Sequence, residues 1–287
     1  MTRPFYLHKK FASQFIKAAL LEDLGEGDHS SRGAVAQKLM TKAKLLIKAD
    51  GVIAGLELAG KIFHHQDSHL KVSFFKKDGA EVKSGEVAFV VEGKARSILA
   101  VERTVLNCMQ RMSGIATHTR SLCSLLEGTK AQLMDTRKTT PNFRLAEKWA
   151  VLIGGGLNHR YALYDMVMLK DNHVDLAGGI ENAIVNTKKY LKRQKKNLRI
   201  EIETRTLQEV EEVVRVGGVD VIMLDNMPIS DMRQAVKIVD GRYLLEASGG
   251  ITASNLRQVA QCGVNFISMG ALTHSVKSLD LSLKVFE

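Results

Sequence analysis

Charged and small polar residues follow a succession of short apolar runs in the second half of this sequence. They are Asp135 with Arg137, Lys170, Glu203, Asp225, Ser248 and Gly270. The last four are 22, 23 and 22 residues apart, which is the length of one strand-loop-helix-loop unit. In a barrel of parallel strands, the carboxyl ends of all strands open on one face, where their loops can form one site. The spacing therefore predicts that these residues meet at one end of a barrel.

Two adjacent cations, Arg137 and Lys138, lie next to Thr136 in the segment Asp135–Pro141. A guanidinium group presents a planar fork that matches a carboxylate or a phosphate in bidentate fashion. Two cations just after a buried strand are therefore expected to face an anion. The alternative is an exposed turn with ordinary surface charges, and these residues alone leave both interpretations open.

A second group of donors follows the three glycines at 154–156. His159 and Arg160 come shortly after them, and Lys170 ends the next apolar run. Glycines permit a close approach of the backbone to a ligand. The segment lacks the spacing of a dinucleotide fingerprint or a Walker loop, which argues against a dinucleotide-binding protein. Together with Arg137, these residues favour a site for an anionic small molecule.

Glu203 and Asp225 end neighbouring apolar runs on the same predicted face. Mg²⁺ usually takes one or two protein carboxylates and completes its shell with water and substrate oxygens. The two residues are therefore candidate Mg²⁺ ligands, directly or through water. The alternative is that each carboxylate pairs with a neighbouring Lys or Arg.

Two late loops predict a phosphate site. The first follows a predicted strand and precedes a helix that we expect to begin near Thr252 or Ser254. Backbone N–H groups at such a position bind phosphate, and in barrels the late loops usually supply this site. The candidate residues of the two loops are Ser248, Gly249 and Gly250, then Gly270, Ala271 and Leu272.

The fold class is predicted to be α/β, because apolar strand-like runs alternate with helix-like segments. The runs are 132–134, 166–169, 199–202, 219–224, 243–245 and 264–268. A doubly wound sheet would concentrate its site at one switch point, whereas polar residues here follow every run. We therefore favour a parallel α/β barrel, open because it has about six strands.

The first part of the chain has a different pattern, with an amphipathic helix and strand-like runs at 43–49, 70–75 and 87–91. A long helix is predicted from about Ser97, with Gly114 as a possible point of interruption. The resulting domain boundaries are an α/β sandwich over 1–110, to which 275–287 could add a segment, and the open barrel with the active site over 111–274.

The formal net charge of +10, from 41 Lys and Arg against 31 Asp and Glu, raises the alternative of a nucleic-acid-binding protein. The basic run at 188–196 has no regularly alternating aromatic residues, so we expect a solvated helix end and no nucleic-acid partner. No segment approaches the roughly 18 apolar residues of a membrane helix, so we expect no membrane association and a cytoplasmic location.

The sequence resembles the quinolinate phosphoribosyltransferases, also called nicotinate-nucleotide pyrophosphorylases (carboxylating), of the type II phosphoribosyltransferase family. The matching segments cover nearly the whole chain: 22–28, 102–107, 113–117, 135–141, 154–160, 170–173, 201–203, 224–226, 246–251 and 268–275. Asn142-Phe143 departs from the family, which often has Gly-Leu there, and His29-Ser30 stands where Ile-Thr is frequent. A related enzyme acting on nicotinate or another base is the nearest alternative.

The resemblance implies an N-terminal α/β sandwich and an open barrel in a homodimer whose active sites lie between subunits. It implies Mg²⁺-dependent transfer from phosphoribosyl pyrophosphate to quinolinate with decarboxylation, which gives nicotinate mononucleotide, pyrophosphate and CO₂ in NAD synthesis. The resemblance implies that Arg103 contributes to the partner's site, and that the substrate-binding residues, mainly for quinolinate, are Thr136, Arg137, Lys138, His159 and Arg160. It implies catalytic roles for Lys170, near both substrates, and for Glu203 and Asp225, which would serve Mg²⁺ and phosphoribosyl pyrophosphate. The residues implied to bind phosphate are Ser248, Gly249, Gly250, Gly270, Ala271 and Leu272.

Overall fold

The computed structural model describes residues 3–286 and divides the chain into two compact units. The first unit consists of Met1–Arg120, Lys138–Gly155 and Ala271–Glu287, and the second of Ser121–Arg137 and Gly156–Gly270. The first unit thus includes the segment 138–155, which the sequence pattern assigned to the barrel. Among the described residues, no helix is long and apolar enough to span a membrane.

A four-stranded antiparallel sheet forms the framework of the first unit, in the order β12-β1-β5-β3. The strands are β12 (Leu281–Phe286), β1 (Met40–Ile47), β5 (Val87–Lys94) and β3 (Lys71–Phe74), and a small sheet pairs β2 (Gly51–Val52) with β4 (Glu81–Val82). Ala43, Leu45 and Ile47 alternate along β1 and are fully or almost fully buried. Such alternation is typical of a strand with one face in the core. The C-terminal segment contributes strand β12 to this sheet, where it pairs with β1.

The helices of the first unit are η1 (Phe5–Leu7), α1 (Lys9–Leu24), α2 (His29–Ala34), α3 (Leu56–Gln66), α4 (Ala95–Ser124), α5 (Arg144–Gly154) and α11 (Ala271–His274). The long helix α4 runs through Gly114, so the interruption considered at this residue does not occur. A Cβ atom at Gly114 would overlap the backbone carbonyl oxygen of Lys277. Glycine is needed there because another chain segment packs against the helix, which outweighs its low helix propensity.

A buried ion pair joins α4 to α5 in the first unit. Glu147 is fully buried and accepts hydrogen bonds from Arg111 Nη2 at 2.9 Å and from the backbone N and the hydroxyl of Thr140, both at 3.0 Å. Arg111 also donates to the carbonyl oxygens of Thr273 and Val276. The ion pair therefore connects α4 both to the segment around Thr140 and to the chain around α11, at Thr273 and Val276.

Replacing Glu147 with alanine is expected to lower the free energy of unfolding by about 3 kcal/mol, at the lower end for a broken buried pair because Arg111 is partly exposed. Chemical denaturation of the variant measures the loss. Glu81→Ala is the matched control, since the Glu81 side chain is 81% exposed, and its unfolding midpoint should stay near that of the wild type. Equal midpoints for both variants would contradict the proposed importance of the pair.

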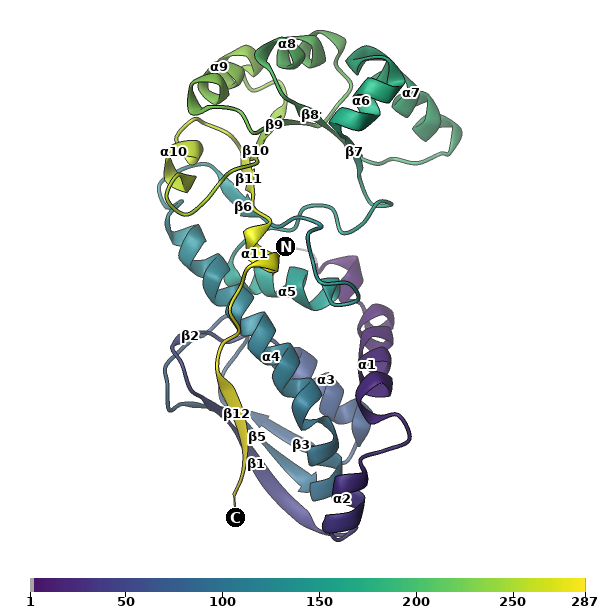
Figure 1. Cartoon of the computed structure of the whole chain (residues 1–287), viewed down its shortest axis with the longest axis vertical. Coiled ribbons are helices and arrows are strands. Elements are labelled where there is room, and N and C mark those ends of the chain that lie inside the picture. Colours follow the sequence, from purple (N-terminus) through teal and green to yellow (C-terminus); the bar gives the residue numbers. More distant parts are fainter. Residues whose placement is uncertain (1–2, 287) are drawn as a thin grey trace. The chain divides into compact units, whose positions relative to one another are not determined.

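The second unit is an open barrel of six parallel strands in the order β6-β11-β10-β9-β8-β7. Figure 1 shows the strands along an arc with the helices on its outer side. The strands are β6 (Gln132–Met134), β11 (Phe266–Ser268), β10 (Leu244–Ser248), β9 (Val221–Asp225), β8 (Ile200–Thr204) and β7 (Val167–Leu169). Each overlaps a predicted apolar run, and the observed architecture confirms the predicted fold class.

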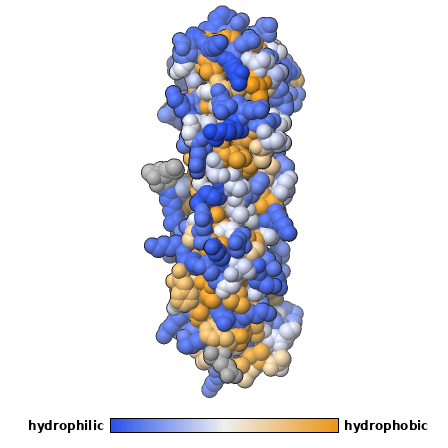
Figure 2. All heavy atoms as spheres, turned by 90° about the vertical axis from the view of Figure 1, so that its left-hand side faces the viewer, coloured by the Kyte–Doolittle hydropathy of each residue, from blue (hydrophilic) through white to orange (hydrophobic). Residues whose placement is uncertain are grey.

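The helices of this unit are α6 (Asp171–Ala177), α7 (Ile180–Arg193), α8 (Leu207–Val216), α9 (Ile229–Val239) and α10 (Leu256–Ala260). Helix α8 illustrates how the sequence sets them: the Thr206 side chain caps its start by accepting from the Glu209 backbone N, and Val210 and Val213 are fully buried. On the face drawn in Figure 2, hydrophilic and apolar residues are interspersed.

Candidate active site

The carboxyl ends of the barrel strands carry the polar residues of the predicted series. The parallel register places Ser248 opposite Asp225, Thr204 opposite Leu224, and Leu169 opposite Ile202. Lys170 follows Leu169 directly, and its Nζ lies 2.5 Å from Glu203 Oε1. The expected convergence of residues from successive strands at one edge is therefore what the register produces.

Asp135 anchors the loop that follows the three glycines. It is fully buried at the end of β6, and its carboxylate accepts from Asn158 Nδ2 at 2.6 Å and from the His159 backbone N at 2.9 Å. An isolated parallel bridge between Met134 and Leu157 continues this contact. Asp135 thereby places His159 and the residue after it beside the end of β6, a role that its position after a strand did not reveal.

Arg137 and Arg160 form a cationic pair in this unit. Arg160 is buried, and its Nη1 donates to the Met166 carbonyl oxygen at 3.3 Å. Burial and, next, the neighbouring Arg137 guanidinium lower the pKa of Arg160. The Nε of Arg137 is buried without a hydrogen-bond partner among the described residues. Two neighbouring guanidinium groups with an unused buried donor form a site for an anion, because an anion would satisfy both.

Glu203 and Asp225 offer carboxylate oxygens at the same edge of the sheet. The Glu203 side chain is 9% exposed and pairs with Lys170, while Asp225 Oδ2 accepts from Asn226 Nδ2 at 2.9 Å. The pairing of Glu203 with a lysine is the alternative that the sequence left open. Each carboxylate nevertheless keeps a second oxygen, so this donor set also fits a Mg²⁺ ion that binds one or two carboxylates and several waters.

The first glycine loop lies at the end of β10. Gly249 and Gly250 have φ angles of +86° and +62°, which favour glycine, and a Cβ atom at Gly249 would overlap the Asn226 side chain. The expected start of the next helix near Thr252 or Ser254 is wrong. Helix α10 begins at Leu256, because Asn255 Oδ1 accepts from the Thr252 backbone N at 2.8 Å and closes a turn first.

The remaining predicted residues have the following positions. Thr136 is half-buried after β6, and Gly270 is half-buried after β11. In the first unit, Arg103 is exposed on α4, Lys138 is exposed, and Ala271 and Leu272 begin α11.

The residue Asn142, which departs from the family pattern, has a left-handed backbone with φ of 60°. Asparagine is one of the few residues other than glycine that adopt this region readily. The departure therefore preserves a backbone shape that glycine would also provide.

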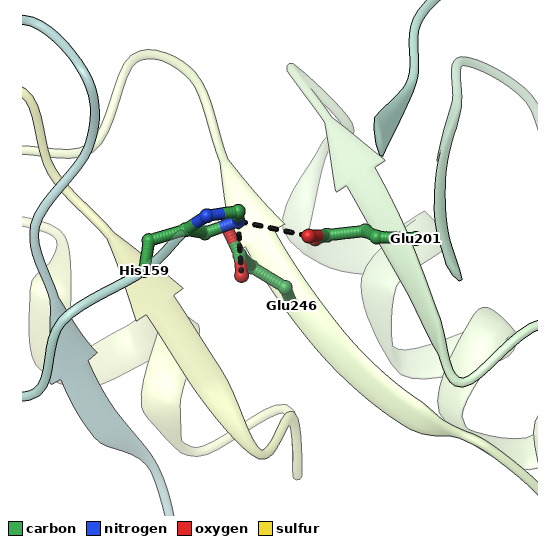
Figure 3. A group of neighbouring side chains, drawn as sticks. All are labelled: His159, Glu201 and Glu246. Carbon is green, nitrogen blue, oxygen red and sulfur yellow. Dashed lines mark ion pairs between the residues drawn. The ribbon is translucent and has the colours of Figure 1, made fainter. Parts of the chain in front are cut away.

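A buried cluster of His159, Glu201 and Glu246 was not anticipated. Their side chains are only 6%, 1% and 1% exposed, and His159 Nε2 lies 2.8 Å from Glu201 Oε2 and 3.5 Å from Glu246 Oε2. Figure 3 shows the three side chains pointing toward one another from separate segments. A signal was present in the sequence, since each glutamate stands two residues before a predicted site residue and so on the same face of its strand.

Comparisons with known proteins agree with this geometry. Models of the quinolinate phosphoribosyl transferase N-terminal and C-terminal domains match residues 28–113 and 115–284. The nicotinate-nucleotide pyrophosphorylase [carboxylating], chloroplastic, of Arabidopsis thaliana is 46% identical over 94% of this chain and 81% of its own length. The probable nicotinate-nucleotide pyrophosphorylase [carboxylating] of Bacillus subtilis is 41% identical over 96% of this chain and 93% of its own.

Solved structures agree as well. The crystal structure of NadC from Streptococcus pyogenes superposes with a TM-score of 0.90 at 36% identity and covers 100% of both chains. The fold and the cationic edge of the open barrel thus define a phosphoribosyltransferase of the pentosyltransferase class. Within that class, the chain belongs to the quinolinate phosphoribosyltransferase family.

Proposed function

We propose that this chain transfers a phosphoribosyl group from phosphoribosyl pyrophosphate to quinolinate, with loss of CO₂, and forms nicotinate mononucleotide for NAD synthesis. The observation that carries the proposal is the pair of neighbouring guanidinium groups of Arg137 and Arg160, with a buried Nε that has no partner among the described residues. Quinolinate has two carboxylates, and the planar forks of two arginines match them. The family membership of the chain supports the same reaction.

Positioning and electrostatics account for most of the mechanism. Phosphoribosyl pyrophosphate and quinolinate are both anions, so cations at the barrel edge must first offset their repulsion. Arg137 and Arg160 hold the carboxylates and orient the pyridine nitrogen toward the ribose carbon. Lys170, displaced from Glu203 toward the substrates, stabilises the negative charge of the leaving pyrophosphate. Lys138 and Thr136 are further proposed substrate-binding residues, and His159 belongs to the proposed quinolinate site as the residue that precedes Arg160.

The bond changes of the proposed reaction require only the two substrates and a proton from solvent. The pyridine nitrogen forms a bond to the ribose carbon as the bond to pyrophosphate breaks, and the nitrogen becomes cationic. The 2-carboxylate then leaves as CO₂, and the electron pair of the broken C–C bond stays on the ring carbon beside the cationic nitrogen. That carbon takes a proton from solvent.

Magnesium is proposed as the cofactor, held by Glu203 and Asp225 directly or through water. When bound, Mg²⁺ supplies positive charge that neutralises the phosphate oxygens. The glycine loop Ser248–Gly250, with Gly270, Ala271 and Leu272, is the proposed phosphate site, because its backbone can approach a phosphate closely.

Replacing Gly249 with alanine is expected to weaken binding of phosphoribosyl pyrophosphate by about tenfold. The added Cβ would overlap Asn226, which holds the Asp225 carboxylate, and the left-handed backbone would be strained by about 1–2 kcal/mol. Calorimetric titration with phosphoribosyl pyrophosphate and Mg²⁺ measures the change. Gly241→Ala is the matched control, since it has φ of 71° and open space around the Cβ. Equal affinities in the two variants would contradict the assignment of this loop.

The proposed assembly is a homodimer with shared active sites, in which Arg103 reaches the site of the partner subunit. Arg103 is exposed on α4 and makes no hydrogen bond or ion pair with any of residues 3–286. An exposed cation without a partner is available to a neighbouring subunit. A cytoplasmic location, and the absence of nucleic-acid and membrane partners, remain predictions from the sequence.

One assay tests the proposed function against its alternatives. Purified protein with Mg²⁺ and phosphoribosyl pyrophosphate should form nucleotide and release CO₂ with quinolinate, and should form little nucleotide with nicotinate. Efficient use of nicotinate would instead identify the related base-specific enzyme. Tight, steeply salt-dependent DNA binding without either reaction would favour the nucleic-acid-binding alternative.

A further inference from the structure

The environment of His159 shows which of its ring nitrogens carries a proton. Nδ1 lies 2.7 Å from the backbone N of Arg160, which donates to it. Nδ1 is therefore an acceptor, and the proton of the neutral ring is on Nε2. Nε2 faces Glu201 Oε2 at 2.8 Å and Glu246 Oε2 at 3.5 Å, and a lone pair in that direction would be repelled by both carboxyl oxygens.

The two glutamates hold the ring by charge more than by one directed hydrogen bond. Neither contact has the alignment of a hydrogen bond, and Nε2 has no such partner among the described residues. The ring N–H is instead attracted by oxygens from two sides (Figure 3).

The His159 ring connects this cluster to the anion site. Asp135 accepts from the backbone N of His159, and the His159 ring accepts from the backbone N of Arg160. Consecutive backbone N–H groups are thus held by two side chains, and the second of these is fixed by Glu201 and Glu246. The His159 ring therefore holds the backbone of Arg160, from which the guanidinium group extends.

We propose that Glu201 and Glu246 are positioning residues that hold His159 as its Nε2–H tautomer and thereby align Arg160 for the dicarboxylate substrate. This inference rests on the proposed function for its substrate. A buried metal ion is the other occupant that one histidine and two carboxylates could hold, and the ligand atoms lie within 4.8 Å of one another. Nδ1 accepts from the Arg160 backbone N, whereas a histidine that binds a metal through Nε2 would carry its proton on Nδ1, which favours the protonated Nε2 over a metal ion.

The first test reads the tautomer directly in the full-length wild-type protein. Nitrogen-15 NMR of labelled histidines, with His159→Gln to assign the signal, should show a neutral ring protonated at Nε2. Metal analysis of the same sample should find no stoichiometric transition metal. A ring protonated at Nδ1, or one equivalent of bound metal, would overturn the proposal whether or not the protein uses quinolinate.

The second test uses Glu246→Gln, which keeps the shape and removes the carboxylate, with Glu201→Gln as a second variant. The dissociation constant for quinolinate should rise by about tenfold or more, while that for phosphoribosyl pyrophosphate should change less than about twofold. Glu181→Gln is the control, because its side chain is 60% exposed. Thermal unfolding checks that the variants are folded.

The outcomes separate the two proposals. Wild-type protein that fails to bind quinolinate would refute the proposed function and leave the tautomer result to decide the role of the cluster. Wild-type protein that binds quinolinate, with folded Glu246→Gln and Glu201→Gln variants of equal affinity, would refute the positioning role alone. Equal losses for both substrates would indicate a merely structural role and would also overturn it.

Discussion

Arg137→Ala and Arg160→Ala are each expected to weaken quinolinate binding by about 2–5 kcal/mol, the range for removing one member of a buried charged pair. Each substitution removes one guanidinium group from the anion site. The remaining arginine can then pair with only part of the substrate charge. In both variants, the dissociation constant for quinolinate is measured by calorimetric titration in the absence of phosphoribosyl pyrophosphate.

The stability of the two variants to unfolding in the absence of ligand provides an independent check. Mutual repulsion of Arg137 and Arg160 is relieved when either is removed, so the variants should be at least as stable to unfolding as the wild type in the absence of ligand. Arg137→Lys should recover only part of the affinity, because an ammonium group keeps the charge but lacks the planar fork. Arg215→Ala is the control, since this side chain is 65% exposed. Affinities near that of the wild type in both Arg137→Ala and Arg160→Ala would remove the carboxylate site from this part of the barrel.

The strands of the barrel could be predicted because burial on both faces leaves an apolar run in the sequence. The regular spacing from Glu203 to Gly270 then ordered their carboxyl ends, and the register of the sheet confirms the common edge. This part of the site depends on local pattern and on the geometry of parallel strands, both of which a single sequence records.

Other features depend on contacts that no local pattern records. Gly114 suggested a helix break, yet its small size is required by packing against Lys277. Glu201 lies inside the predicted apolar run 199–202, and Glu246 is distant from it in the chain. Their contacts with His159 depend on the folded barrel and could not be predicted from a local pattern. The start of α10 is displaced by a hydrogen bond that the Asn255 side chain accepts from the Thr252 backbone N, which competes with helix formation.

Mixing Arg103→Ala subunits with Lys170→Ala subunits is expected to restore activity, although each variant alone should be almost inactive. If Arg103 acts in the site of the partner subunit, one site of each hybrid dimer combines an intact Lys170 with an intact Arg103. The other site of the same hybrid lacks both side chains. Random mixing of equal amounts makes half of the dimers hybrid, so about a quarter of the wild-type activity should return.

The hybrids must be isolated for the result to be decisive, for example by placing different affinity tags on the two variants and purifying through both. A purified hybrid should have about half of the wild-type activity, since one of its two sites is intact. An inactive purified hybrid would mean that Arg103 serves its own subunit, because both sites would then carry one substitution. The exposed, unpaired Arg103 side chain on α4 favours recovery, since the charge has no stabilising partner among residues 3–286 and would gain one if a neighbouring subunit presented bound phosphate.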